Sequence, residues 1–236
     1  MSALAERLLR RFYADTKHPY RLFEEQVAAV LPRDGVLLDA GCGRTAPVLQ
    51  NFRGRAGALI GVDLVEFVNP PPDAQLFNTD LANIPVAPAS VDVIMSRSVF
   101  EHLDEPAAVY REFMRILKPG GHVVFLTANA WDYATLIARL TPNRWHPRIV
   151  ARVEGRLESD VFPTRYRTNS RRAVRRLAGD AGFQVEDFRY LGQYPNYLMF
   201  NGALFFVGTC YDKLVSRFEL LRFLRGWIMV TLRKPE

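Results

Sequence analysis

Two glycines with acidic residues on either side could hold a nucleotide-type cofactor. Val36-Leu37-Leu38 predicts a short buried strand, which runs into Asp39-Ala40-Gly41-Cys42-Gly43, and Asp63 lies 20 residues beyond Gly43. Glycines after a strand let the backbone approach a ligand, and an acid at this offset accepts hydrogen bonds from ribose hydroxyls. The spacing predicts a site for an adenosine-containing cofactor, and by itself does not separate NAD from other cofactors of that kind.

Asp39 discriminates between NAD and the other adenosine-containing cofactors. Its carboxylate comes two residues before the first glycine, where it would repel a pyrophosphate docked at the same loop. The same carboxylate suits S-adenosylmethionine, which has no phosphate and carries an ammonium and a sulfonium. The residues therefore favour a methyl donor.

A series of segments extends this interpretation along the chain. In order and spacing they resemble the motifs of class I S-adenosylmethionine-dependent methyltransferases, in particular the bacterial small-molecule group of the type 11/23 kind. Thr45 stands where the first motif usually has a third glycine. The segments are 36–43, 61–64, 78–81, 90–94, 101–103 and 116–121.

The resemblance implies roles for residues at matching positions. The methionine end of the cofactor would lie against the first loop, the ribose hydroxyls against Asp63, and adenine against Leu64. An alternative for Asp39 or Asp80 is a helix cap or a loop acid. The implied cofactor-binding residues are Asp39, Gly41, Cys42, Gly43, Asp63, Leu64, Asp80 and Leu81, with Ser96 and Arg97 beside the methyl group.

Methyl transfer from a sulfonium is an in-line displacement whose leaving group is already installed. Proximity and orientation supply on the order of 7–11 kcal/mol in favourable cases, and a general base is needed only if the acceptor's proton must leave early. His102 is the candidate base, with loop ordering as the alternative, and Tyr133, His146 and Tyr166 are weaker candidates.

We predict no catalytic metal. Relatives that methylate the 2′-oxygen of small RNAs bind a divalent ion through a Glu-x-x-Glu-His cluster. Here the chain reads Ser98-Val99-Phe100-Glu101-His102, so the first carboxylate is missing. Loss of a hard anionic ligand weakens the binding of a hard cation.

Short apolar strands alternate with helices, which indicates a parallel sheet covered on both faces. We expect an α/β fold: a Rossmann-like, seven-stranded, mostly parallel sheet, with helical insertions after strand 5 and between strands 6 and 7. A helix is expected directly after Gly43, and strand 5 at 122–127. We expect one domain over 1–236: N-terminal helices (1–35), a cofactor-binding core (36–129), a lid or acceptor insertion (130–169), the C-terminal part of the sheet (170–190 and 226–236) and an apolar, amphipathic insertion (191–225).

The first insertion is expected to contact the acceptor. Arg165, Tyr166 and Arg167 are candidate substrate-binding residues, because arginine clamps a carboxylate or phosphate in two places. A solvated arginine face is the alternative. Residues 139–176 hold 11 Arg against three acids, more than the whole chain's net charge of +6, and residues 146–157 predict a helix with an arginine stripe. The charge predicts an anionic acceptor.

Residues 191–225 are strongly apolar, and 213–225 predict an amphipathic helix. A lid, a homodimer interface and docking on an anionic membrane all fit this pattern. The uncharged run 190–211 contains glycine, proline and asparagine, which makes it poor material for a membrane span. With two cysteines and no secretory signal pattern, we expect a cytoplasmic protein, either free or peripheral to the inner face of the membrane.

The sequence predicts an enzyme that transfers a methyl group from S-adenosylmethionine to a small-molecule acceptor, anionic or linked to a lipid or glycan. One alternative is a nucleic-acid methyltransferase. It is disfavoured because the Asp/Asn-Pro-Pro-Tyr/Phe motif of amino methylation is absent after the fourth strand, where Ser96-Arg97-Ser98-Val99 stands. The other alternative is a non-catalytic binding protein that retains the fold.

Overall fold

A seven-stranded sheet forms the centre of the fold. The computed structural model describes residues 2–140 and 162–236, so the predicted arginine stripe at 146–157 and His146 lie outside the described residues. The sheet order is β3-β2-β1-β4-β5-β7-β6. The strands are β1 (Val36–Ala40), β2 (Ala58–Asp63), β3 (Ala74–Asn78), β4 (Val91–Arg97), β5 (Leu117–Ala128), β6 (Gln184–Leu191) and β7 (Trp227–Arg233).

The sheet is mostly parallel, as predicted. Strands β3, β2, β1, β4 and β5 pair in parallel. Strand β7 runs antiparallel to β5. Near the start of β5, Gly120 N–H donates to Lys234 O, just past the end of β7. Just past the end of β5, Asn129 N–H donates to Gly226 O, which precedes the start of β7. The central strands are apolar on both faces, which is the pattern of a sheet buried on both sides.

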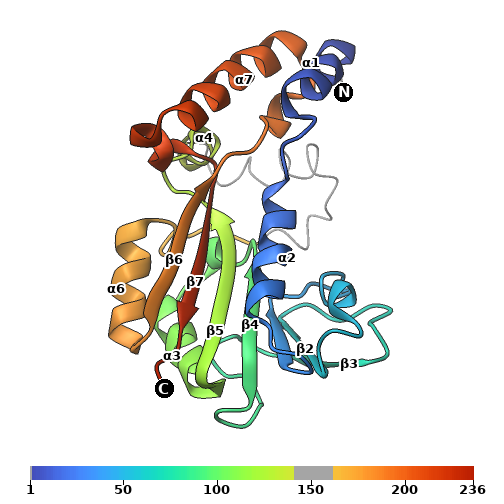
Figure 1. Cartoon of the computed structure of the whole chain (residues 1–236), viewed down its shortest axis with the longest axis vertical. Helices are drawn as coiled ribbons and strands as arrows, with labels where there is room; N and C mark the ends of the chain where they lie inside the picture. Colours follow the sequence, from blue (N-terminus) through green and yellow to red (C-terminus); the bar gives the residue numbers. More distant parts are fainter. Residues whose placement is uncertain (1, 141–161) are drawn as a thin grey trace. The chain divides into compact units, whose positions relative to one another are not determined.

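Helices cover both faces of the sheet. Figure 1 shows α2 (Pro19–Val30) on one face and α3 (Pro106–Ile116) with α6 (Arg171–Ala181) on the other. Helix α6 begins at Ser170, whose side chain accepts from Ala173 N–H, and ends at Gly182 in the left-handed conformation. The remaining helices belong to the insertions and the N-terminus: α1 (Ala3–Tyr13), α4 (Tyr133–Leu140) and α7 (Gly202–Arg217).

Three predicted elements differ from the structure. No helix follows Gly43; the connection to β2 contains only a 3-10 turn, η1 (Leu49–Phe52). Pro47 disfavours helical backbone in the residue before it, and Ala46 indeed has φ +42°. Strand β5 begins at Leu117, five residues before the prediction, because a bulge opposite β4 absorbs Pro119-Gly120-Gly121. The predicted helix 213–225 is divided at Phe218 between α7 and the 3-10 segment η5 (Glu219–Leu224).

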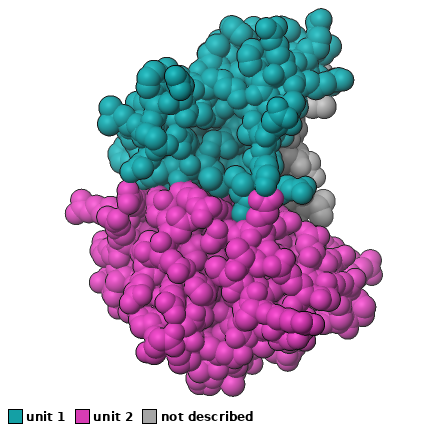
Figure 2. Space-filling view, in the orientation of Figure 1, with its two compact units in different colours: residues 1–22, 128–163, 190–228 teal, residues 23–127, 164–189, 229–236 magenta. Residues whose placement is uncertain are grey.

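The chain forms two compact units, shown in different colours in Figure 2. Unit 1 comprises residues 1–22, 128–163 and 190–228, and unit 2 comprises residues 23–127, 164–189 and 229–236. Unit 1 therefore combines α1 with most of both predicted insertions, while unit 2 holds most of the sheet. The single-domain organisation stays a prediction.

Unit 1 is built around two helices that run side by side in the same direction. Leu4 of α1 packs so closely on Gly202 of α7 that a Cβ at Gly202 would lie 2.6 Å from Leu4 Cβ. At the other end, Lys213 Nζ donates to Phe12 O at 2.7 Å and lies 4.0 Å from the centre of the Tyr13 ring. Two further 3-10 turns complete the described elements, η2 (Phe100–His102) in unit 2 and η4 (Asn196–Leu198) in unit 1. Among the described residues, no helix is both long and apolar enough to cross a bilayer.

Candidate functional site

Three acids lie at or just past the carboxyl ends of three neighbouring strands. Asp39 lies in β1, Asp63 ends β2, and Asp80 follows β3 by two residues. The parallel register pairs Asp39 with Gly61 and Asp63 with Asn78, so the carboxyl ends of the three strands are adjacent. In open α/β sheets, ligands bind in the crevice outside these strand ends. The structure thus brings together the acids that the sequence singled out.

Asp39 is the most perturbed of the three. Its side chain is only 2% exposed, and its Oδ2 atom has no hydrogen-bond partner among the described residues. Burial raises its pKa from 3.8 to about 7; the charge of Arg97 opposes this shift and that of Asp63 adds to it. A cationic ligand group beside Oδ2 would supply the missing partner and hold the carboxylate ionised.

The glycine loop after β1 owes its path to positive φ angles. Gly41 has φ +86° and Gly43 has φ +72°, a region that side chains with a Cβ rarely occupy. A Cβ on Gly41 would lie 2.2 Å from Val99 Cγ2, whereas one on Gly43 would meet no atom within 4 Å. The loop is therefore packed on one side at Gly41 and open at Gly43. Cys42 is buried and its thiol pKa is raised, chiefly by burial, so it contributes backbone shape rather than a nucleophile.

Asp63 connects the glycine loop to the loop after β2. One oxygen, Oδ2, accepts from Gly43 N–H at 2.7 Å, and Oδ1 accepts from Val65 N–H at 3.2 Å. Each carboxylate oxygen keeps a second lone pair, which a ribose hydroxyl can use. Leu64 follows with 57% of its surface exposed, an apolar side chain beside the acid.

Asp80 and Leu81 form the third corner. Asp80 Oδ1 accepts from Ala82 N–H at 2.7 Å, a local turn that fixes the carboxylate, and Leu81 is buried. This turn agrees with the loop-acid alternative and leaves the other oxygen of Asp80 available.

The residues predicted beside the methyl group have structural partners. Ser96 is fully buried and its hydroxyl donates to Ala40 O at 2.7 Å, so it links β4 to the end of β1. An Nη of Arg97 lies 3.3 Å from a carboxylate oxygen of Glu24 in α2. His102 ends the turn η2, and its backbone N–H donates to Val99 O at 2.8 Å.

The predicted acceptor-binding arginines also have anionic partners. Arg165 Nε lies 2.6 Å from Asp104 Oδ1. Arg167 donates to the Asp104 carbonyl, and its guanidinium lies 3.7 Å from Glu105. Tyr166 has φ +52° and donates its N–H to Glu101 O at 3.1 Å. The arrangement favours a structural task for these side chains, and their acceptor role stays a prediction.

Sequence reasoning missed a buried series of hydrogen-bonded side chains in unit 2. Glu101 accepts a hydrogen bond from the Thr127 hydroxyl, which in turn accepts from Asn169 Nδ2 at 2.8 Å. All three side chains are buried. The available signal was the Glu-His-Leu motif at 101–103, which drew attention to His102 instead. These hydrogen bonds join the loop after β4 to the segment before α6, and so hold in place the loop that carries His102.

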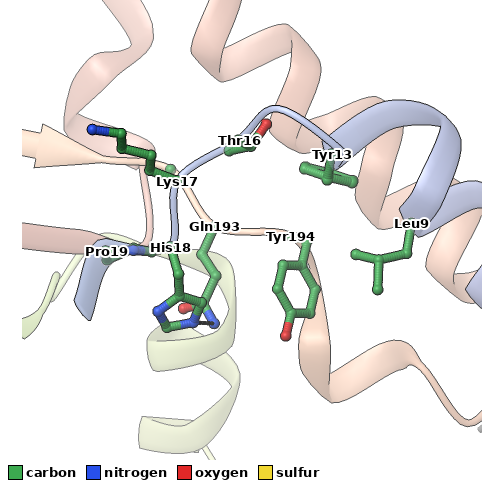
Figure 3. Close-up of a pocket in the computed structure, with 9 residues that line it drawn as sticks. Leu9, Tyr13, Thr16, Lys17, His18, Pro19, Gln193 and Tyr194 are labelled. Carbon is green, nitrogen blue, oxygen red and sulfur yellow. Dashed lines mark hydrogen bonds between the residues drawn. The ribbon is translucent and has the colours of Figure 1, made fainter. Parts of the chain in front are cut away.

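Unit 1 contains a separate cavity of about 210 Å³. Figure 3 shows residues of α1, the turn before α2 and the segment after β6 around it. His18 Nε2 lies 3.1 Å from Gln193 Nε2, and Gln193 Oε1 accepts from Trp227 Nε1–H. The lining segments are about 170 residues apart in sequence, so no local motif could reveal the cavity.

Tyr133, a weaker base candidate, lies in unit 1 at the start of α4. Its ring meets that of Tyr211 edge to face with centres 5.1 Å apart, and burial raises its pKa. Asp132 before it accepts from Ala134 N–H, and burial raises the Asp132 pKa to about 6. In the described part of the chain, no three histidine, cysteine or acidic side chains come together as a metal site.

Comparisons with known proteins identify the family of the chain. A family model described as a methyltransferase domain matches residues 7–187. The chain is 31% identical over 158 residues to a protein of Mycolicibacterium smegmatis named probable S-adenosylmethionine-dependent methyltransferase, covering 64% of this chain and 52% of that protein. It is 33% identical over 132 residues to the ubiquinone biosynthesis O-methyltransferase of Ralstonia nicotianae, covering 51% and 54%.

Solved structures share the fold. The geranyl diphosphate C-methyltransferase of Streptomyces coelicolor has a TM-score of 0.57 at 17% identity, covering 95% of this chain and 84% of that one. The cyclase SpnF has the same TM-score at 20% identity, covering 91% and 81%. The chain spans about half the length of the curated relatives it matches. On the extent of the family match, this chain belongs to the methyltransferase domain family.

Proposed function

We propose that this protein transfers a methyl group from S-adenosylmethionine to a small-molecule acceptor. The observation that carries the proposal is Asp39, a buried carboxylate with an unpartnered oxygen, which comes two residues before a glycine loop that is open at Gly43. A second anion in that position, such as the pyrophosphate of a dinucleotide, would repel it. The ammonium and sulfonium of the methyl donor complement it.

The described residues fit the donor. A side chain at Gly43 would meet no atom within 4 Å, which leaves room for a ligand there, and Asp39 lies in β1 two residues before Gly41. Asp63 would accept from the ribose hydroxyls, Leu64 would cover the adenine, and Asp80 would accept from its amino edge. When bound, the sulfonium supplies both the methyl group and a neutral leaving group.

The chain's own contribution is then positional. The sheet edge and the glycine loop hold the donor in one orientation, and such orientation alone is worth on the order of 7–11 kcal/mol in favourable cases. His102 as a proton acceptor stays a prediction. The series of hydrogen bonds from Glu101 to Asn169 orders its loop, and this ordering also serves the alternative role of His102 as a positioning residue.

A small, amphipathic acceptor is the finer part of the proposal. Its support is that curated relatives are named for ubiquinone biosynthesis, and that a protein of the same fold is named for geranyl diphosphate. A nucleic-acid acceptor would instead show tight binding that weakens steeply with salt.

Isothermal titration tests the cofactor. We expect S-adenosylmethionine and S-adenosylhomocysteine to bind and NAD to give no heat. Asp63→Ala should weaken binding at least tenfold with the fold retained, and Asp180→Ala, an exposed acid on α6, should leave it unchanged. NAD binding in place of the methyl donor would overturn the proposal. Methyl incorporation into a panel of phenolic, isoprenoid and carboxylate acceptors then tests the acceptor class separately.

A further inference from the structure

Helix α7 is apolar on the side that faces away from the rest of unit 1. Its inner side, which includes Phe205 and Val215, is buried. Its outer side repeats Val207, Cys210 and Leu214 at steps of three and four residues, and all three are exposed, Val207 by 64%. A helix that is apolar all round normally has a partner on every side. We therefore expect the outer side of α7 to bind a partner.

The apolar surface continues at both ends of α7. Phe200 in the preceding turn is 69% exposed, and Leu220 in η5 is 86% exposed. Exposed apolar side chains gathered in one segment of the chain are a feature of interaction sites. We call this surface the α7 apolar face; its members are Phe200, Leu204, Phe206, Val207, Cys210, Leu214, Phe218 and Leu220.

The charges beside the α7 apolar face are positive. Arg217 is exposed at the end of the helix, and α1, packed alongside, exposes Arg7, Arg10 and Arg11, of which Arg10 lies 3.6 Å from Glu6. The acids of α7 and η5 are either buried or paired with arginines. Asp212 is buried, and Glu219 lies 3.4 Å from Arg222 and 2.8 Å from Arg225.

This charge belongs to unit 1 as a whole. The segments of unit 1 hold 14 basic and 8 acidic residues, a net +6, whereas those of unit 2 hold 17 of each and are neutral. The arginine-rich segment 139–176 is itself divided between the two units. Six of its 11 arginines, at 165–176, lie in unit 2, where acids balance them.

We propose that the α7 apolar face docks on an anionic lipid bilayer, with its apolar side chains in the interface and the arginines at the phosphates. An apolar stripe with basic neighbours is the pattern of helices that lie in a membrane surface. A second copy of the chain fits less well. In a two-fold dimer the face would meet itself, which would leave the neighbouring arginines without an anionic partner from the other copy's face.

Cys210 offers a direct test, because it is exposed on this face while Cys42 is buried. The full chain carries an environment-sensitive fluorophore on Cys210 and is mixed with vesicles of phosphatidylcholine, with or without phosphatidylglycerol. We expect a blue shift with the anionic vesicles at low salt, and its loss at high salt. The control places the fluorophore on unit 2, in a Cys210→Ser, Val68→Cys chain, because Val68 is 49% exposed there; it should show no shift.

Matched variants separate the two contributions in co-sedimentation. Val207→Asp should abolish vesicle binding, and Arg217→Gln should weaken it about fivefold; Val68→Asp and Arg33→Gln on unit 2 should change nothing. Circular dichroism and thermal unfolding check that each variant retains its fold without assuming cofactor binding, so failure here is distinct from failure of the cofactor proposal. Absence of binding to anionic vesicles at low salt would overturn the inference. So would a concentration-dependent dimer that Val207→Asp disrupts, because the face would then belong to a second copy.

Discussion

Asp39 combines a cost in stability with a use in binding. Its folded pKa of about 7 lies above the unfolded value of 3.8, so the folded protein binds that proton more tightly than the unfolded chain. The stabilisation from the protonated carboxyl is fully present below pH 3.8 and is lost as the pH rises toward 7. Above pH 7 the cofactor-free protein holds a buried, uncompensated charge. Under the proposed function, a cationic ligand would remove this disadvantage, and Asp39 would thereby couple folding to cofactor binding.

Asp39→Asn should therefore stabilise the cofactor-free protein and weaken the cofactor complex. At pH 8 we expect the free energy of unfolding to rise by about 1–3 kcal/mol, less than the ~4 kcal/mol that the full pKa shift represents. The gain should disappear by pH 4. Urea unfolding across this pH range measures it, with Asp180→Asn as the control. In the wild type, affinity for S-adenosylmethionine should fall below pH 7 as Asp39 protonates. The same gain at pH 4 and pH 8 would contradict this account.

At the scale of elements, the β1–β2 connection shows what sequence could and could not predict. The strands, the acid positions and the sheet class followed from local apolar patterns and motif spacing, since each depends on neighbouring residues. The helix predicted after Gly43 is absent because Pro47 disfavours helical backbone at Ala46. The prediction followed the usual pattern of the motif and did not take this local constraint into account. The series of hydrogen bonds from Glu101 through Thr127 to Asn169 depends on residues far apart in sequence, so it needed the fold.

Gly43→Ala should separate loop geometry from ligand contact. The added Cβ meets no protein atom within 4 Å, so only the positive φ opposes it, at about 1 kcal/mol. The methyl group would nevertheless project into the open side of the loop, and we expect at least tenfold weaker binding of S-adenosylhomocysteine. Gly54→Ala is the matched control, because its φ is +70° and its surroundings are equally open. Equal affinity in both variants would show that the cofactor does not approach the loop at Gly43.

At the scale of the molecule, the proposals assign different tasks to the two units. All the implied cofactor residues lie in unit 2, which is neutral, while the basic charge, the α7 apolar face and the separate cavity lie in unit 1. Sequence order concealed this division, because unit 1 is assembled from three separate segments. The charge also divides unequally, because the segments of unit 1 hold a net +6 while those of unit 2 are neutral.

This division predicts a specific pattern of hydrogen exchange. S-adenosylhomocysteine should slow exchange at the backbone amides of 41–43, 63–65 and 80–82, where Asp63 and Asp80 already order the loops through Gly43, Val65 and Ala82. Anionic vesicles without cofactor should instead slow exchange in α7 and leave those three loops unchanged. Because the two ligands address different units, each serves as the control for the other. Protection of α7 by cofactor alone, with none in the three loops, would place the cofactor in unit 1 and contradict the assignment made from Asp39, Asp63 and Asp80.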